Sequence, residues 1–349
     1  MNRLSRGMRT MIPVFLLATL AGCGSNASAQ TSENSNGLKT VRVSEIVHSI
    51  LYTPLYAADA LGYFADEGLK VNITTANGGD AVSASLIGGQ AEIGLVGPEM
   101  AVYVHNNPEG DAKLVTFSQL TNTDGLFLNS FDARDSFKWE DVIGKTIIGS
   151  TPGSTPQLVL EYVLDQNGID IENDVKVITN LDPPARAGAF SQGIAEFGVM
   201  SSPSSEDFDR SGHPIVASMG EEVGALPYTV FLSENSWLKD NEDTAQAFSD
   251  AVYRAMLWTK NATAAQIAET IKPYFAETDT GTVTAAIERY KNMSVPIWAP
   301  TPVPNEKDME TFLDIQVFGG LVAEDARPAF DDIFVTHIAE NSVKNVKSP

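Results

Sequence analysis

Short apolar runs alternate with stretches of helical periodicity along much of the chain. Residues 41–47 alternate apolar and polar side chains, which predicts a strand, and further strands are expected at 71–74, 93–96, 114–120 and 126–129. Between these strands, apolar spacing with Pro and Gly punctuation predicts helices at 54–61, 80–86 and 101–106. This alternation of strand and helix predicts a largely parallel sheet with helices on both faces.

The stretch 77–99 has the strongest turn signals. Asp80 is a good N-cap for the helix that it begins, and Gly88 and Gly89 can supply the positive φ that ends that helix. The strand that follows ends at Gly97-Pro98-Glu99. Because ligands bind at the carboxyl ends of strands in open α/β sheets, we interpret this stretch as one wall of a ligand cleft.

The pattern recurs in the second part of the chain. Residues 89–96 (Gly-Gln-Ala-Glu-Ile-Gly-Leu-Val) are echoed at 193–200 (Gly-Ile-Ala-Glu-Phe-Gly-Val-Met), an offset of 193 − 89 = 104 residues. The same offset aligns two further predicted strands, at 146–149 and 175–179, with strands of the first copy. A period of this length is far longer than that of a solenoid repeat. We therefore expect two similar α/β lobes.

The last predicted strands are followed by a mainly helical C-terminal part. Strands are expected at 215–218 and 228–232, and helices at 244–261, 264–271, 282–292 and 306–318. The proline-rich segment 294–305 predicts an extended connection.

The order of elements indicates how the chain divides between the lobes. We expect it to cross from one lobe to the other near residue 130 and to return near residue 225. The first lobe would then comprise residues 39–129 and 225–349, and the second residues 130–224. Two crossings form a hinge.

The N-terminus reads as an export signal. Residues 1–22 combine three arginines with an apolar segment at 11–20, as in a secretory signal peptide. The sequence Leu20-Ala21-Gly22-Cys23 that follows resembles the lipobox of bacterial lipoproteins, which implies that Cys23 is lipid-modified. The polar residues of 23–38 predict a flexible linker to this anchor. We expect a protein held at the cell membrane and facing outside the cytoplasm; ordinary cleavage near Ala29 would also export it.

The chain is strongly acidic. It carries 45 acidic and 23 basic residues, and removal of the signal's three arginines leaves a net charge of 20 − 45 = −25. This balance argues against a nucleic-acid partner, which requires a basic surface. Cys23 is the only cysteine and the four histidines show no zinc spacing, so we expect no metal site and no cofactor.

Several motifs occur together in order. They are 52–58 (Tyr-Thr-Pro-Leu-Tyr-Ala-Ala), 62–71 (Gly-Tyr-Phe-Ala-Asp-Glu-Gly-Leu-Lys-Val) and 88–94, with continuations at 144–147 and 162–168. As a set they resemble the substrate-binding proteins of ABC importers in the nitrate, sulfonate, taurine and thiamine-precursor superfamily. The resemblance implies a two-lobed periplasmic-binding-protein-like fold (type II) with the ligand cleft between the lobes. It also implies a monomer that delivers a small molecule to ABC permease and ATPase subunits.

Candidate ligand-binding residues lie in the loops at strand ends. They are His48, Ser49, Tyr52, Gly79, Asp80, Gly97, Glu99, Gln119, Thr151, Ser154, Thr155, Ser202 and Tyr228. Each also has a structural interpretation: a lone histidine such as His48 is more often a satisfied structural residue, and Asp80 can serve only as a helix cap.

The acidic candidates bear on the charge of the ligand. Asp80 and Glu99 would repel an oxyanion and suit an amino group or a protonated ring nitrogen, and Tyr52 could stack on a flat ring. These residues favour a thiamine-precursor pyrimidine or a similar nitrogen heterocycle. The alternative is nitrate, an aliphatic sulfonate or taurine, which needs donors such as the hydroxyls and free N–H groups of the loop 149–155.

An enzyme on the same fold is a remote alternative. A related pyrimidine-forming enzyme depends on a cysteine-rich motif that this chain lacks. A serine hydrolase would require serine at the centre of Gly-x-Ser-x-Gly, where residues 149–153 have Thr151. We therefore expect no catalytic residues. A third class, a surface adhesin or scaffold, predicts no small-molecule cleft.

Overall fold

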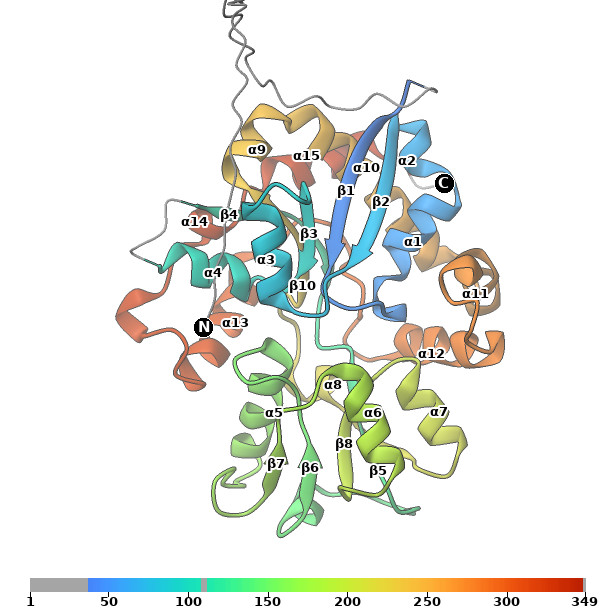
Figure 1. Ribbon diagram of the computed structural model, residues 1–349, viewed down its shortest axis with the longest axis vertical. Coiled ribbons are helices and arrows are strands. Elements are labelled where there is room, and N and C mark those ends of the chain that lie inside the picture. Colours follow the sequence, from blue (N-terminus) through green and yellow to red (C-terminus); the bar gives the residue numbers. More distant parts are fainter. Residues whose placement is uncertain (1–36, 108–111, 348–349) are drawn as a thin grey trace, which may run out of the picture. The chain divides into compact units, whose positions relative to one another are not determined.

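Two five-stranded sheets organise the described residues, 37–107 and 112–347, of the computed structural model (Figure 1). The signal peptide, Cys23 and nearly all of the polar linker lie outside the described residues. No helix in the described part of the chain combines the length and apolar composition needed to cross a membrane.

The first sheet has the strand order β2-β1-β3-β10-β4. Its strands β1, β2 and β3 pair in parallel, whereas β10 is antiparallel to both of its neighbours. The bounds are β1 Lys39–Glu45, β2 Leu69–Thr75, β3 Ile93–Val96, β4 Leu114–Thr121 and β10 Thr229–Glu234.

The second sheet has the equivalent order β7-β6-β8-β5-β9. Here β5 is the reversed strand, antiparallel to β8 and β9. The bounds are β5 Leu126–Ser130, β6 Thr146–Ile148, β7 Lys176–Ile178, β8 Phe197–Ser201 and β9 Ile215–Ser218. Each sheet and the helices packed against it form one lobe, so the prediction of two mainly parallel α/β lobes is confirmed.

Helices connect the strands and form the C-terminal part of the chain. Their bounds are α1 Thr53–Ala60, α2 Tyr63–Asp66, α3 Gly79–Ile87, α4 Glu99–His105, α5 Thr155–Gln166, α6 Pro183–Ser191, α7 Ser204–Arg210, α8 Met219–Val223, α9 Asn235–Asp240, α10 Glu242–Asn261, α11 Ala264–Ile271, α12 Thr280–Asn292, α13 Glu306–Phe318, α14 Phe330–Ile333 and α15 His337–Asn345.

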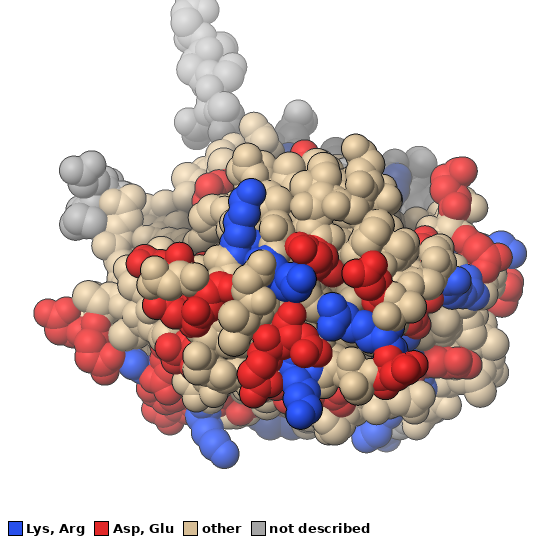
Figure 2. Space-filling view, turned by 90° about the horizontal axis from the view of Figure 1, so that it is seen from below, with Lys and Arg blue, Asp and Glu red and all other residues tan. Residues whose placement is uncertain are grey.

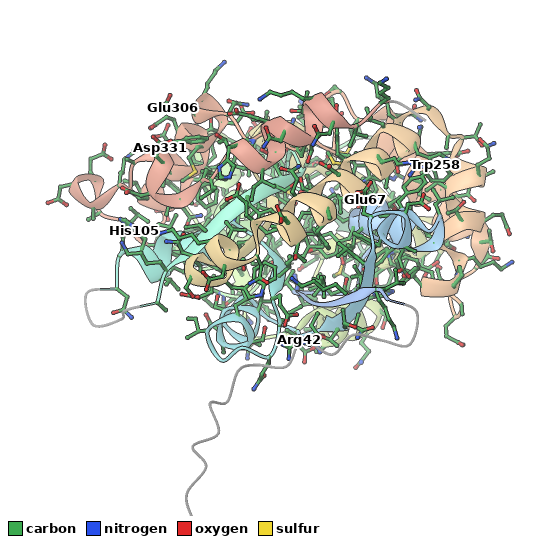
Figure 3. All side chains as sticks on the ribbon, turned by 90° about the horizontal axis from the view of Figure 1, so that it is seen from above. Arg42, Glu67, His105, Trp258, Glu306 and Asp331 are labelled. Atoms are coloured by element: carbon green, nitrogen blue, oxygen red, sulfur yellow. The ribbon has the colours of Figure 1, made fainter. Side chains whose placement is uncertain are left out.

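The sequence repeat corresponds to a repeated contact. In the first lobe, the carboxylate of Glu92 accepts a hydrogen bond from the backbone N–H of Arg42 at 2.7 Å. In the second lobe, Glu196 accepts from the backbone N–H of Thr146 at 3.0 Å. Thr146 follows Arg42 by 104 residues, and Glu196 follows Glu92 by the same number. Arg42, labelled in Figure 3, also forms an ion pair with Glu92. The repeated glutamate thus holds β1 in the first lobe and β6 in the second.

The first crossing between the lobes differs from our expectation. The strand β5 was expected to close the first lobe, but it belongs to the second sheet, so the chain crosses at residues 122–125, before β5, and not near residue 130. An apolar run such as Leu126-Phe127-Leu128 predicts burial in a sheet without specifying which sheet. The chain returns at residues 224–228, between α8 and β10.

The start of α3 also differs from our expectation. Its N-cap is Gly78, and Asp80 lies exposed in the first helical turn, so Asp80 is not the cap. The two glycines before Asp80 allow the backbone to turn sharply enough for the helix to begin one residue earlier. The helix ends as predicted, with Gly89 at φ 66°.

C-terminal helices contact the second lobe. Helix α12 packs on α7, where the hydroxyl of Thr282 donates to Asp207 at 3.0 Å, and α13 packs on α5. The segment 294–305 before α13 contains no helix and bends at several residues, so it is not the continuous extended connection that was expected. Within it, the carbonyl of Ile297 accepts from the backbone N–H of Asn122 at 2.8 Å. These contacts place C-terminal elements beside the crossings.

The surface charges are distributed. Acidic and basic side chains are interspersed on the face viewed from the second-lobe side in Figure 2. Figure 3 shows Glu306 and Asp331 at the periphery of the C-terminal helices, and both residues are exposed.

One aromatic cluster of the first lobe centres on Phe248 of α10. Its ring is fully buried, 5.1 Å from Phe64, 5.0 Å from Phe231 and 6.3 Å from Phe117 between ring centroids. The cluster joins α10 to the first sheet and to α2.

We expect Phe248→Ala to lower the free energy of unfolding by about 3–5 kcal/mol, because it leaves a cavity among these rings. Urea-induced unfolding followed by tryptophan fluorescence measures the change. The matched control is Phe318→Ala, since Phe318 is 43% exposed and its truncation should cost under about 1 kcal/mol. Equal costs for the two variants would contradict the assigned core.

Candidate ligand-binding cleft

A cavity of about 540 Å³ lies between the two lobes. Most of its walls are loops at the carboxyl ends of parallel strands, as expected for an open α/β sheet. In the first lobe these loops follow β1, β2 and β3, and in the second lobe the loop 150–156 follows β6. The beginning of β10 adds Tyr228 and Thr229.

Most of the expected ligand-binding residues line this cavity. They are Ser49, Tyr52, Gly79, Asp80, Gly97, Glu99, Thr151, Ser154, Thr155 and Tyr228. Their position in the cavity wall agrees with the sequence analysis, and their contact with a ligand stays a prediction. His48, Gln119 and Ser202 are not among the lining residues.

His48 is a structural residue. Its Nδ1 lies 3.0 Å from Glu45 Oε1, and its Nε2 lies 2.8 Å from the carbonyl oxygen of Tyr274. The hydrogen bond to Glu45 raises the pKa of His48, which suits a ring that donates from both nitrogens. The ring also stacks on Phe275 at 4.7 Å. These partners hold the imidazole outside the cleft wall.

Gln119 and Ser202 are also satisfied internally. The amide of Gln119, buried in β4, donates to the carbonyl of Thr121 at 3.1 Å. The hydroxyl of Ser202 donates to Glu206 at 3.1 Å, and the Ser202 carbonyl accepts from Ser49 at 3.4 Å. A position near a strand end does not determine the face on which a side chain lies, because successive residues alternate between faces.

Glu99 is the buried acidic group of the cavity. It is 3% exposed in the first turn of α4, and its carboxylate folds back over Gly97. A Cβ at position 97 would lie 1.9 Å from Glu99 Oε2, so a larger residue there would have to displace this carboxyl group. The hydroxyl of Thr155 donates to Glu99 Oε2 at 2.8 Å, which joins the two lobes. Burial raises the pKa of Glu99 to about 7.

Further hydrogen bonds connect the lobes beside Glu99. The hydroxyl of Tyr103 lies 2.9 Å from both the carbonyl oxygen of Gly153 and Oε1 of Gln316 in α13. Gln316 in turn donates to Thr155 at 3.5 Å. The structure is therefore a form in which the lobes are in contact, with α13 taking part.

Arg186 was missed by the sequence analysis. It is the only basic residue among the described residues that line the cavity. Its Nη1 donates to Ser150 Oγ at 2.8 Å, and burial lowers its pKa. The offset of 183 − 79 = 104 residues places α6 in register with α3, but the repeat does not identify Arg186, because its counterpart Val82 is buried and does not line the cavity.

The remaining walls are apolar or aromatic. Apolar contacts come from Ile46, Val47, Leu51, Met100, Leu126 and Leu321, and aromatic ones from Tyr52, Tyr103 and Tyr228. Burial raises the pKa of Tyr52 and Tyr228, so both hydroxyls remain protonated and can donate hydrogen bonds. Such walls suit a small organic molecule.

The described part of the cavity wall has no imidazole, thiol or amine side chain. The described residues that line the cavity include no His, Cys or Lys. Across residues 37–107 and 112–347 there is no cluster of three or more His, Cys, Asp or Glu side chains that could hold a metal ion.

Comparisons with known proteins agree with this geometry. The NMT1-like family matches residues 46–272. YtlA of Bacillus subtilis (strain 168), whose name describes it provisionally as a binding protein, is 39% identical over 312 residues, which are 89% of this chain and 90% of YtlA.

Two solved structures share the fold. The periplasmic nitrate-binding protein NrtA from Synechocystis PCC 6803 has a TM-score of 0.69 at 14% identity, over 89% of this chain and 90% of NrtA. The alkanesulfonate-binding protein SsuA from Xanthomonas axonopodis pv. citri, bound to MOPS, has a TM-score of 0.65 at 14% identity, over 89% of this chain and 98% of SsuA.

We expect the stability of the protein to fall as pH rises from about 4.5 to about 7. Burial raises the pKa of Glu99, Asp124 and Glu206 to about 7, well above their values in an unfolded chain. In this window the folded protein binds more protons than the unfolded chain, so the free energy of unfolding decreases with pH. Glu99→Gln should reduce that decrease by about 1–3 kcal/mol.

Urea unfolding at a series of pH values measures this effect. Glu306→Gln, at an exposed position, is the matched control and should follow the wild-type profile. If Glu99→Gln also follows the wild-type profile, Glu99 is not a buried titrating group.

Proposed function

The chain belongs to the NMT1-like family, and on that premise we propose that it is the extracytoplasmic substrate-binding protein of an ABC importer. The observation that supports this function is the cavity between two lobes, bridged by Glu99 and Thr155. Its partners would be a small-molecule ligand and the permease and ATPase subunits of the importer. The family and the shared fold with nitrate- and alkanesulfonate-binding proteins support the same reading.

The mechanism is closure about a hinge. The two crossings, 122–125 and 224–228, are the covalent links between the sheets, and the hydroxyl of Thr123 in the first crossing donates to the carbonyl of Gly224 in the second at 2.5 Å. An open form would admit the ligand. A ligand that contacts both walls would favour the closed form, in which Tyr103 and Glu99 reach the second lobe.

The ligand that we propose is a nitrogen heterocycle, such as a thiamine-precursor pyrimidine. The carboxyl group of Glu99 can pair with an amino group or a protonated ring nitrogen, and Tyr52 can contact a flat ring. A cavity of about 540 Å³ is within the range of ligand pockets. The second candidate is nitrate, an aliphatic sulfonate or taurine, which the guanidinium of Arg186 favours.

Catalysis is not part of this proposal. The polar residues of the cavity are hydroxyls, amides, two carboxylates and one guanidinium, without an imidazole or a thiol to act as base or nucleophile among the described lining residues. We propose no catalytic residue and no cofactor.

We expect isothermal titration calorimetry at pH 7 to detect a nitrogen heterocycle with a Kd in the micromolar range or below, accompanied by proton release. A cation beside Glu99 would lower its pKa and displace its proton, whereas an anion would cause proton uptake. Glu99→Gln should weaken binding about 30-fold or more, and Glu306→Gln should not. Tight binding of nitrate, sulfonates or taurine with no response to pyrimidines would overturn the heterocycle assignment.

We also propose a lipid anchor on Cys23, which lies outside the described residues. The expected result is that the wild type sediments with the membrane fraction, and that Cys23→Ser releases it or leaves its signal peptide uncleaved, because a lipidated Cys is the only anchor in the proposal. Immunoblots of cell fractions measure this, with Ser25→Ala as the matched control. Cys23→Ser that stays in the membrane fraction with its signal peptide removed would exclude the anchor.

A further inference from the structure

The cavity holds opposite charges on opposite lobes. Glu99 belongs to the first lobe and Arg186 to the second, and both line the same space. Tyr228 lines the same cavity and interacts electrostatically with each of them. No ion pair joins them in the structure; among the described residues Glu99 has Thr155 as its side-chain partner.

Arg186 has bonding capacity that the protein leaves unused. Its Nη1 donates to Ser150, but its buried Nε has no hydrogen-bond partner among the described residues. Asp182, on the preceding turn, acts on it electrostatically without forming an ion pair within the described chain. A guanidinium offers five donors in a planar fork, and a buried one with unsatisfied donors is costly unless a ligand completes it. An acidic group fits this fork.

The neighbours of Arg186 suit the same group. Ser150, Thr151 and Ser154 line this side of the cavity, and the 12-residue helix α5 begins at Thr155. Hydroxyls and a helix start are hydrogen-bond donors for an anion. The second lobe therefore presents donors, whereas Glu99 of the first lobe presents an acceptor.

We propose that the ligand is a ring-sized molecule with two different ends: an acidic group that binds Arg186 on the second lobe and a nitrogen donor that binds Glu99 on the first. This inference rests on the proposed function, which it makes more specific. The acidic end is a carboxylate, a sulfonate or a phosphate, all of which match the guanidinium fork. The ligand itself forms the charge bridge between the lobes.

The size of the cavity supports a molecule with two ends. A volume of about 540 Å³ exceeds by many times the space of about 30 Å³ that one water takes in the liquid, so nitrate alone would leave most of the cavity unfilled. The apolar residues Leu51, Leu126 and Met100 lie in the wall with the charged groups and suit the body of a ring.

A ligand with only one of the two ends should bind poorly. Closure around it would leave either Glu99 or Arg186 buried without a partner, and an uncompensated buried charge is strongly unfavourable. Each end of the ligand therefore contributes most to the binding free energy when the other end is present. The effects of removing the two ends should not be additive.

The test uses three matched probes: an aminopyrimidine that carries a carboxylate, the same ring without the carboxylate, and the same ring without the amino group. Sulfonate and phosphate versions of the first probe identify the preferred acid. Calorimetry measures affinity, and small-angle X-ray scattering measures closure. We expect the complete probe to bind about 100-fold or more tightly than either half and to be the one that closes the lobes.

Substitutions at Arg186 and Glu99 test the two ends of the ligand separately. Arg186→Gln should remove the advantage of the acidic group and tighten the binding of the carboxylate-free ring, because closure around that ring then leaves no guanidinium without a charged partner. Arg186→Lys should restore part of the advantage of the acidic group. Glu99→Gln should remove the advantage of the amino group. Lys176→Gln, at an exposed position of the same lobe, is the charge-matched control. Urea unfolding of each variant shows whether it is folded.

The outcomes distinguish this inference from the proposed function. Equal affinity for the complete probe and the carboxylate-free ring, or unchanged binding by Arg186→Gln, would overturn the two-ended ligand and leave the binding function standing. If a small molecule without an acidic group closes the lobes, the inference is also wrong. If no probe and no molecule of a broad metabolite panel closes them, the proposed function itself fails.

Discussion

The arrangement of the cleft depends on one buried carboxyl group. Glu99 folds over Gly97, where a larger residue would have to displace its carboxyl group, and accepts a hydrogen bond from Thr155 of the opposite lobe. A buried carboxyl group is tolerated when protein groups replace the water it has lost. Thr155 is such a partner only while the lobes touch. Closure of the lobes and the solvation of Glu99 are therefore coupled, and the same group links ligand charge, pH and conformation.

The charge of the cavity differs from that of the whole protein. The chain has a formal net charge of −22, yet a guanidinium lines the cavity with its Nε unsatisfied and no ion pair to the carboxylates there. Among the described residues, Asp80 and Glu99 are the acidic ones that line the cavity, and on the face in Figure 2 acidic and basic side chains are interspersed. The net charge of the protein therefore does not indicate the charge of the ligand. The hydrogen-bond donors and acceptors that line the cavity are the better indicator.

The sequence predicted the elements better than their partners. Period-two and helical spacing, with glycines such as Gly89, located most strands and helices, and the repeated glutamates Glu92 and Glu196 revealed two lobes. The sheet to which β5 belongs could not be predicted, because an apolar run predicts that a strand is buried but not which strands pair with it. Arg186 was missed since a single arginine on a helix carries no local signal. The hydrogen bonds of His48 agree with the structural interpretation of a lone histidine, but its partners, Glu45 and the Tyr274 carbonyl, could not be named because they come together only in the folded protein.

The reversed strands have a consequence for the independence of the lobes. β5 follows the first sheet's β4 but pairs in the second sheet, and β10 follows the second sheet's β9 but pairs in the first. This is the topology of a strand-swapped dimer whose two halves are joined in one chain. Neither half contains all the strands of its own sheet, and β10 fills an interior position between β3 and β4. A chain cut between the halves would leave a gap inside each sheet, so the protein is one folding unit with two lobes.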